Sequence, residues 1–117
     1  MAELVNKNNI KPILTGITAY PGLVKGNVLM IIDPLVSLKQ EAQGMIVVAK
    51  YLTPVAALKV LKAKAIICEQ AGLTSHAAVV ARDYAIPCIV GVKEALNIIQ
   101  ENDVLVVDAD KGEIYRK

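Results

Sequence analysis

The sequence contains no phenylalanine and no tryptophan, and four tyrosines are its only large aromatic residues. A core built on big aromatic rings is therefore excluded. Hydrophobic residues make up 55% of the chain, so Ile, Val, Leu and Ala must fill the interior. Side chains of this kind favour helices packed closely on strands rich in β-branched residues. The composition also excludes a disordered tail, because it supplies enough apolar surface for a packed core.

Arginine is scarce as well, since Arg82 and Arg116 are the only two. No basic run is interleaved with aromatic residues, and the formal net charge is only +2. These features argue against a nucleic-acid partner. No apolar run approaches the ~20 residues that a membrane-spanning helix needs, and the polar segment 1–11 shows no secretory signal. We therefore expect a cytoplasmic protein without a membrane partner.

Cysteine is limited to Cys68 and Cys88, each of which lies in an apolar run. Neither belongs to a CxxC pair, and a cytosolic setting disfavours disulfides. The pattern predicts two buried free thiols rather than a disulfide or a metal pair. No metal site is predicted anywhere in the chain.

A length of 117 residues fits a single domain. Segment 1–12 is polar, has little periodicity and is predicted to be a flexible N-terminal arm or linker, which leaves 13–117 as the folded domain. Apolar and β-branched segments predict strands at 13–18, 23–32, 45–49, 65–68, 87–92, 103–107 and 113–116.

Turn residues punctuate these strands. Tyr20-Pro21-Gly22 and Asp110-Lys111-Gly112 predict turns, because Pro fixes φ and Gly permits a positive φ. Gly26-Asn27 predicts a bulge or a tight turn inside the strand over 23–32.

Helices are predicted between the central strands. Thr53-Pro54 is a strong helix start, a hydroxyl N-cap followed by proline at the first helical position, and the helix runs to about Lys62. It places Val55, Leu58 and Leu61 or Lys62 at helical spacing. Further helices are predicted over 76–84 and, as a short helix or turn, over 94–99. The alternation of strand and helix predicts an α/β core with parallel strands, flanked by antiparallel hairpins.

The only histidine, His76, stands where a loop passes into the helix over 76–84. Histidine has an unperturbed pKa of ~6.5, so near neutral pH it offers a nucleophilic nitrogen. A helix start presents unpaired N–H groups and about half a positive charge, which favour an anion. Gly72 offers a pliable loop backbone, and Thr74 and Ser75 offer hydroxyls for capping or for phosphate oxygens. A nucleophile beside an anion site is what covalent phosphate transfer requires.

Helical spacing places this imidazole at the edge of the buried face. At 100° per residue, one stripe of the helix carries Ala77, Val80, Ala81 and Tyr84, with Arg82 and Asp83 away from it. A plainer interpretation is that the histidine is a surface or capping residue and that the alanines serve only close helix–sheet packing. The physical cues by themselves leave both interpretations open, and the spacing does not decide whether Arg82 reaches the same anion.

A resemblance favours the first interpretation. Residues 72–82 (GLTSHAAVVAR), followed by 85–91 (AIPCIVG), resemble the phosphohistidine motif of the mobile, swivelling domain of phosphoenolpyruvate-utilising enzymes. That family includes phosphoenolpyruvate synthase, pyruvate phosphate dikinase and enzyme I of the sugar phosphotransferase system, and the AAVVAR segment is closer to the two dikinases. Residues 16–22 with Gly26, and 106–108 with 112–114, resemble the family's domain entry and closing hairpin. The resemblance thus covers nearly the whole of 13–116.

The resemblance implies a swivelling β/β/α domain with a mixed sheet and short helices. His76 would accept a phosphoryl group and pass it on, supported by Gly72, Thr74, Ser75 and Arg82, and Thr74 matches a position of regulatory phosphorylation in some dikinases. An ATP-grasp nucleotide domain and a barrel domain for pyruvate or phosphoenolpyruvate would be the partners, in cis or in trans. ATP and Mg²⁺ would bind those partners, not this domain, which would be a phosphotransferase component not competent alone.

The chain departs from the family pattern at Ala71-Gly72, where two glycines are usual. Alanine tolerates a positive φ poorly, so the phosphate loop could be less pliable here. A non-catalytic binding or regulatory module that keeps the fold is the main alternative function. A hydrolase using Ser75 or a cysteine with His76 is a third hypothesis. The sequence leaves open the final phosphoryl acceptor, the oligomeric state, and whether the chain works alone or inside a longer enzyme.

Overall fold

The computed structural model describes residues 11–33, 42–70 and 72–117. Most of the predicted arm and Ala71 therefore lie outside the described residues. In chain order the elements are β1 (Leu14–Thr15), β2 (Ile17–Tyr20), β3 (Leu23–Ile31), β4 (Ile46–Ala49), α1 (Pro54–Lys59), β5 (Ala65–Cys68), α2 (His76–Tyr84), β6 (Cys88–Val90), α3 (Ala95–Ile98), β7 (Val104–Asp108) and β8 (Glu113–Arg116).

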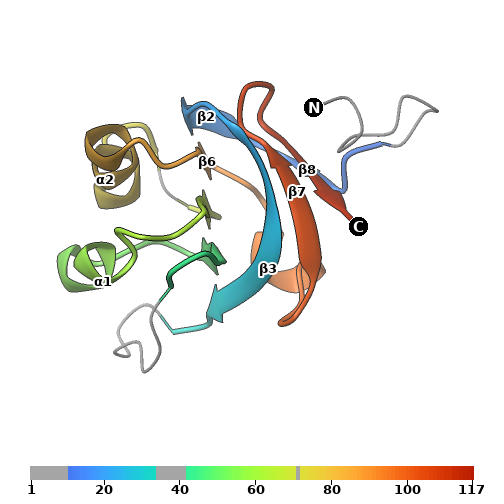
Figure 1. Cartoon of the computed structure of the whole chain (residues 1–117), viewed down its shortest axis with the longest axis horizontal. Coiled ribbons are helices and arrows are strands. Elements are labelled where there is room, and N and C mark those ends of the chain that lie inside the picture. The colour runs from blue at the N-terminus through green and yellow to red at the C-terminus, as the bar shows by residue number, and fades with distance from the viewer. Residues whose placement is uncertain (1–10, 34–41, 71) are drawn as a thin grey trace.

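The strands form a mixed sheet in the order β1-β8-β7-β3-β4-β5-β6-β2. The pairs β3–β4, β4–β5 and β5–β6 are parallel. The pairs β1–β8, β8–β7, β7–β3 and β6–β2 are antiparallel. Figure 1 shows α1 and α2 together on one side of the parallel strands, with β7 and β8 on the other side of the molecule. The predicted α/β core with antiparallel flanks is confirmed.

The two edges of this sheet are joined through Gly16, so the sheet approaches a closed barrel. The predicted single strand over 13–18 is two strands: β1 pairs with β8, and β2, one residue later, pairs with β6 at the other edge. A Cβ at Gly16 would lie 2.7 Å from both the Ile89 Cγ2 atom and the Val90 carbonyl oxygen. The chain therefore crosses from one edge to the other where only a glycine fits.

Strand β3 belongs to both halves of the sheet. Its residues 23–27 pair antiparallel with β7, and its residues 28–31 pair parallel with β4. The expected bulge or tight turn at Gly26-Asn27 is wrong, because both residues pair in regular register with Leu105 and Val104. These residues mark the point where β3 changes partners, and the strand curves through it without a break (Figure 1).

Alternate residues of the central strands face two different cores. On β4, Ile46 and Val48 belong to a cluster inside the barrel, while Val47 and Ala49 belong to a cluster under α1 and α2. Both faces of these parallel strands are covered, so β4, β5 and β6 are buried along their whole length. This explains why the central strands are continuous apolar runs.

Helix α1 begins as predicted but buries a different face. The Thr53 hydroxyl caps it by accepting from the Ala56 N–H at 3.1 Å, and Pro54 takes the first turn. The buried residues are Ala56, Ala57 and the capping Val60, whereas Val55 and Leu58 are 62% and 67% exposed. Small side chains are the ones that let the helix approach the sheet, so the apolar spacing of the larger residues did not predict the packed face.

The entry and exit segments of the domain interlock by hydrogen bonds. The Thr18 hydroxyl donates to the Ala109 carbonyl at 2.6 Å, and the Ala109 N–H donates to the Gly22 carbonyl at 2.7 Å. The Gly16 N–H donates to the Gly112 carbonyl at 2.9 Å. The glycine-containing segments at the two ends of the chain therefore hold the fold closed.

Candidate phosphoryl-accepting site

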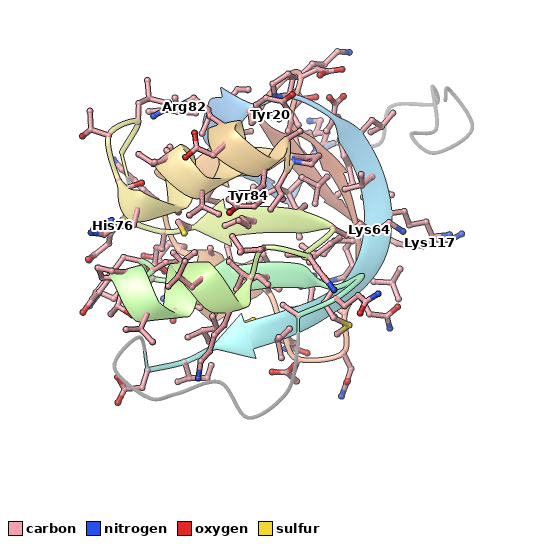
Figure 2. The ribbon with its side chains drawn as sticks, turned by 60° about the vertical axis from the view of Figure 1, so that its left-hand side comes forward. Tyr20, Lys64, His76, Arg82, Tyr84 and Lys117 are labelled. Carbon is pink, nitrogen blue, oxygen red and sulfur yellow. The ribbon has the colours of Figure 1, made fainter. Side chains whose placement is uncertain are left out.

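His76 is the first residue of α2, which follows the loop after β5. All three helices begin after parallel strands, so His76 lies at the carboxyl edge of the sheet, where open α/β proteins place ligands. The helix spans His76–Tyr84, as the sequence predicted. Ala77, Ala78 and Ala81 pack on the sheet, and the His76 side chain is exposed. Figure 2 shows His76 at the end of the helix.

The helix start is fixed by Ser75. Its hydroxyl accepts from the Ala78 N–H at 3.3 Å and donates to the Gly72 carbonyl at 2.7 Å, and its own N–H donates to the same carbonyl at 3.1 Å. Both hydrogen bonds of this hydroxyl therefore stabilise the start of the helix. Ser75 is thereby a positioning residue, which orients the first turn that carries the imidazole.

The first turn of α2 keeps donors free. The N–H groups of His76 and Ala77 donate to no protein group among the described residues, whereas Ala78 and Val79 donate to Ser75. Two adjacent unpaired N–H groups at a helix start can bind the oxygens of an anion. The loop beside them is open, because a Cβ built on Gly72 meets no atom within 4 Å.

Arg82 braces the loop from the far side of the helix. One of its terminal nitrogens donates to the Leu73 carbonyl at 2.6 Å. Figure 2 shows Arg82 and His76 on different sides of α2. The structure thus brings the guanidinium to the loop backbone that precedes the helix and not to the imidazole.

Gly72, Thr74 and Tyr84 are all exposed. Gly72 does not have a positive φ, so its own conformation does not require a glycine. Thr74 is exposed, and its hydroxyl has no protein partner in the described ranges. Tyr84, expected on the buried stripe, is 55% exposed, and Ala78 takes part in the packed face instead. Sequence reasoning missed that Val79, 43% exposed, shares the outward face with His76; its spacing of three residues was the available signal.

The two thiols are buried and free, as predicted. Burial raises the pKa of Cys68, and burial raises the pKa of Cys88 to about 12. Neither side chain can act as a thiolate near neutral pH. Because the Ser75 hydroxyl is also committed to the cap, the geometry opposes the hydrolase hypothesis.

No three His, Cys, Asp or Glu side chains gather into a metal-binding group anywhere in the described ranges. Across the same residues, no helix is both long enough and apolar enough to cross a membrane. The polar groups around His76 are backbone N–H groups and hydroxyls, which suit an anion and not a cation.

The structure is thus an α/β domain with a nearly closed mixed sheet and an exposed histidine at a capped helix start. Comparison with known proteins agrees: the family described as PEP-utilising enzyme, mobile domain, matches residues 41–112, and the chain belongs to that family. A relative named "Probable phosphoenolpyruvate synthase" from Methanothermobacter thermautotrophicus is 36% identical over 118 residues. That match covers 98% of this chain but only 17% of the relative, so the chain spans about a sixth of its length.

Solved structures share the fold. A solution structure of an Enzyme I (nEIt) protein aligns with a TM-score of 0.60 and 26% identity over 70% of this chain and 34% of that one. The crystal structure of Thermococcus kodakaraensis aconitase X aligns with a TM-score of 0.71 over 89% of this chain and 97% of that one. At 24% identity, the second likeness concerns the fold alone. The predicted mixed-sheet α/β fold and the predicted family are confirmed.

Proposed function

We propose that this domain is a phosphoryl carrier that is transiently phosphorylated on His76. The observation that supports this most is the exposed imidazole on the first residue of α2, beside two unpaired N–H groups. Membership of the family of PEP-utilising mobile domains supports the same chemistry. The two thiols are buried and so do not compete with the imidazole as nucleophiles.

The step is a displacement at phosphorus. A lone pair on an imidazole nitrogen forms the N–P bond while the bond from phosphorus to the donor's oxygen breaks, and the donor leaves with that electron pair. The free N–H groups of His76 and Ala77 stabilise the negative charge on the phosphoryl oxygens. In the second half-reaction an acceptor oxygen attacks, the N–P bond breaks and the imidazole is restored. Gly72, Thr74 and Ser75 shape the loop, and Arg82 holds it.

The donors and acceptors belong to partner domains in this proposal. A nucleotide site of the ATP-grasp type and a barrel domain that binds pyruvate or phosphoenolpyruvate would alternate at His76, in cis or in trans, and would supply ATP and Mg²⁺. The relative that is named as a probable phosphoenolpyruvate synthase is about six times longer than the matched segment, which leaves room for such domains. A cytoplasmic location and regulation through the exposed Thr74 belong to the same proposal.

The direct test uses phosphoramidate, a small phosphoryl donor that needs no partner domain. We expect acid-labile, base-stable phosphate on His76, located by mass spectrometry, and none on His76→Ala. A second reaction adds isolated nucleotide and barrel domains of a phosphoenolpyruvate synthase with ATP and Mg²⁺. Label from the small donor but none from the partner domains would favour the alternative, a binding or regulatory module that keeps the fold. No label from either donor would overturn the carrier proposal.

A further inference from the structure

A group of three lysines lies at the end of the domain opposite to His76. Lys25 is on β3, Lys64 immediately precedes β5 and Lys117 follows β8. Figure 2 shows Lys64 and Lys117 on one side of the molecule and His76 on the other. The three residues come from segments far apart in the sequence, so the fold alone assembles the group.

Sheet pairing brings Lys25 and Lys117 together. Strands β3 and β8 flank β7: Lys25 pairs with Val106, which pairs with Tyr115. Two residues after Tyr115, the Lys117 N–H donates to the Val104 carbonyl at 2.9 Å and extends the ladder. In a strand, residues two apart share a face, so Lys117 lies on the Tyr115 face of β8.

The third lysine lies against β3 beside Gly26. A Cβ built on Gly26 would lie 3.2 Å from the Lys64 Cδ atom, so the Lys64 stem passes directly against this part of β3. The three ammonium groups act on one another: the close approach of Lys117, partial desolvation and the charge of Lys64 all lower the pKa of Lys25.

None of the acidic side chains that the structure describes compensates these charges. Arg116 forms an ion pair with Asp103, and none of the three lysines has an acidic side-chain partner among the described residues. Like charges held together without a counterion are unfavourable, and a bound anion would relieve that repulsion.

We propose that Lys25, Lys64 and Lys117 form a docking site for a carboxylate-rich segment of a protein partner. Helices α1, α2 and α3 all begin at the carboxyl edge of the parallel strands, whereas Lys64 lies at the amino edge. In the part of the chain that the structure describes, this end of the domain thus lacks the helix N-terminus that a phosphate site uses. Lysine supplies flexible point charges, and three of them on separate segments fit carboxylates spaced along a chain. Occupation of this site leaves His76 uncovered.

The test is a titration of isotopically labelled protein with a blocked polyglutamate peptide at low ionic strength, followed by backbone amide shifts. The largest shifts are expected at Lys25, Lys64, Lys117 and the intervening Val106. Adding salt weakens the binding. Lys25→Gln combined with Lys64→Gln is expected to weaken it about fivefold, from the usual strength of exposed ion pairs. His76→Ala is expected to bind the peptide normally, so this result is independent of phosphoryl transfer.

A charge-matched control replaces Lys93 and Lys111, which are exposed elsewhere on the surface. Equal weakening in that control would show attraction by net charge and would overturn the proposal. Inorganic pyrophosphate serves as a competing probe: if it binds these lysines more tightly than the peptide, the ligand is a phosphate and the carboxylate site is wrong. Melting temperatures of both double variants verify that each is folded.

Discussion

The helix-covered half of this domain and its antiparallel half are built for different tasks. In the first half, strands β4, β5 and β6 end in loops that lead into helices, and one of those loops carries His76. In the second half, the turn between β7 and β8 hydrogen-bonds to the segment that contains β1 and β2. The proposed phosphoryl transfer and the hydrogen bonds that close the sheet therefore lie in different halves, so we expect a substitution in one half to leave the role of the other unchanged.

The strongest separation is expected at His76. His76→Ala should abolish phosphoryl transfer, because the nucleophilic nitrogen is lost. The free energy of unfolding should change by less than about 0.5 kcal/mol, since an exposed side chain contributes little packing. Acid-labile phosphate and urea denaturation measure the two effects. An unfolded His76→Ala variant would show that the fold also depends on this residue for stability.

The reverse case is Gly112→Ala, in the turn between β7 and β8. Gly112 has a φ of 69°, and a Cβ there would press against the Gly16 carbonyl oxygen. We expect a loss of about 2–4 kcal/mol in the free energy of unfolding. At a temperature where the variant remains folded, His76 should still be phosphorylated at the normal rate. Gly44→Ala, at a φ of 71° with nothing nearby, is the control for backbone strain without the contact.

The two helix caps allow a finer comparison within the helix-covered half. Ser75→Ala and Thr53→Ala each remove a hydroxyl that accepts from the first turn of a helix. Each should cost about 1 kcal/mol of stability. Only Ser75→Ala should slow phosphorylation, because only that cap orients the imidazole. Equal rates in the two variants would mean that the loop at Ser75 has no part in positioning His76.

The two arginines provide a similar pair with a smaller effect. Arg82 donates to the Leu73 carbonyl in the loop before α2, and Arg116 donates to the Ile98 carbonyl and to Asp103 in the other half. Replacing either by alanine removes exposed bonds worth about 0.5–1.5 kcal/mol. Arg82→Ala should lower the rate of phosphorylation several-fold, and Arg116→Ala should leave it unchanged. Initial rates with phosphoramidate provide the measurement.

The smallest effect is expected at Gly72. Its φ is not positive and its surroundings are open, so Gly72→Ala should change the unfolding free energy by less than about 0.5 kcal/mol. A markedly slower phosphorylation with this unchanged stability would show that an anion approaches the backbone where the new methyl group lies. A large loss of stability would contradict the loop conformation described above.

The sequence predicted the elements that local chemistry determines. Thr53-Pro54 marked a helix start, and the boundaries of α2 followed from Ser75 at its beginning and from the end of the alanine-rich stripe. Buried parallel strands were recognisable as short apolar runs because both of their faces are covered. These features depend on residues close to one another in the chain.

The features that sequence reasoning missed depend on contacts between distant segments. Gly26 resembled a bulge because a glycine inside a strand is usually one, but here it makes room for Lys64. Leu58 fitted an apolar stripe, yet the smaller Ala57 is the residue that packs. The grouping of Lys25 with Lys117 had no periodic signal, since β7 brings their strands together. Arg82 belongs to the motif, but its contact with the Leu73 carbonyl could not be predicted because that contact depends on how the loop folds back on the helix.

The pairing of β1 with β8 places the first and the last described strands side by side. Leu14 lies opposite Ile114, so the chain enters and leaves through adjacent strands, and these strands are remote from His76 (Figures 1 and 2). Adjacent attachment points act as a single pivot. Under the proposal that partner domains alternate at His76, a turn about that pivot would move His76 through a wide arc while the strands at the pivot scarcely move. Because β3 runs unbroken through both halves, the domain would travel as one lever.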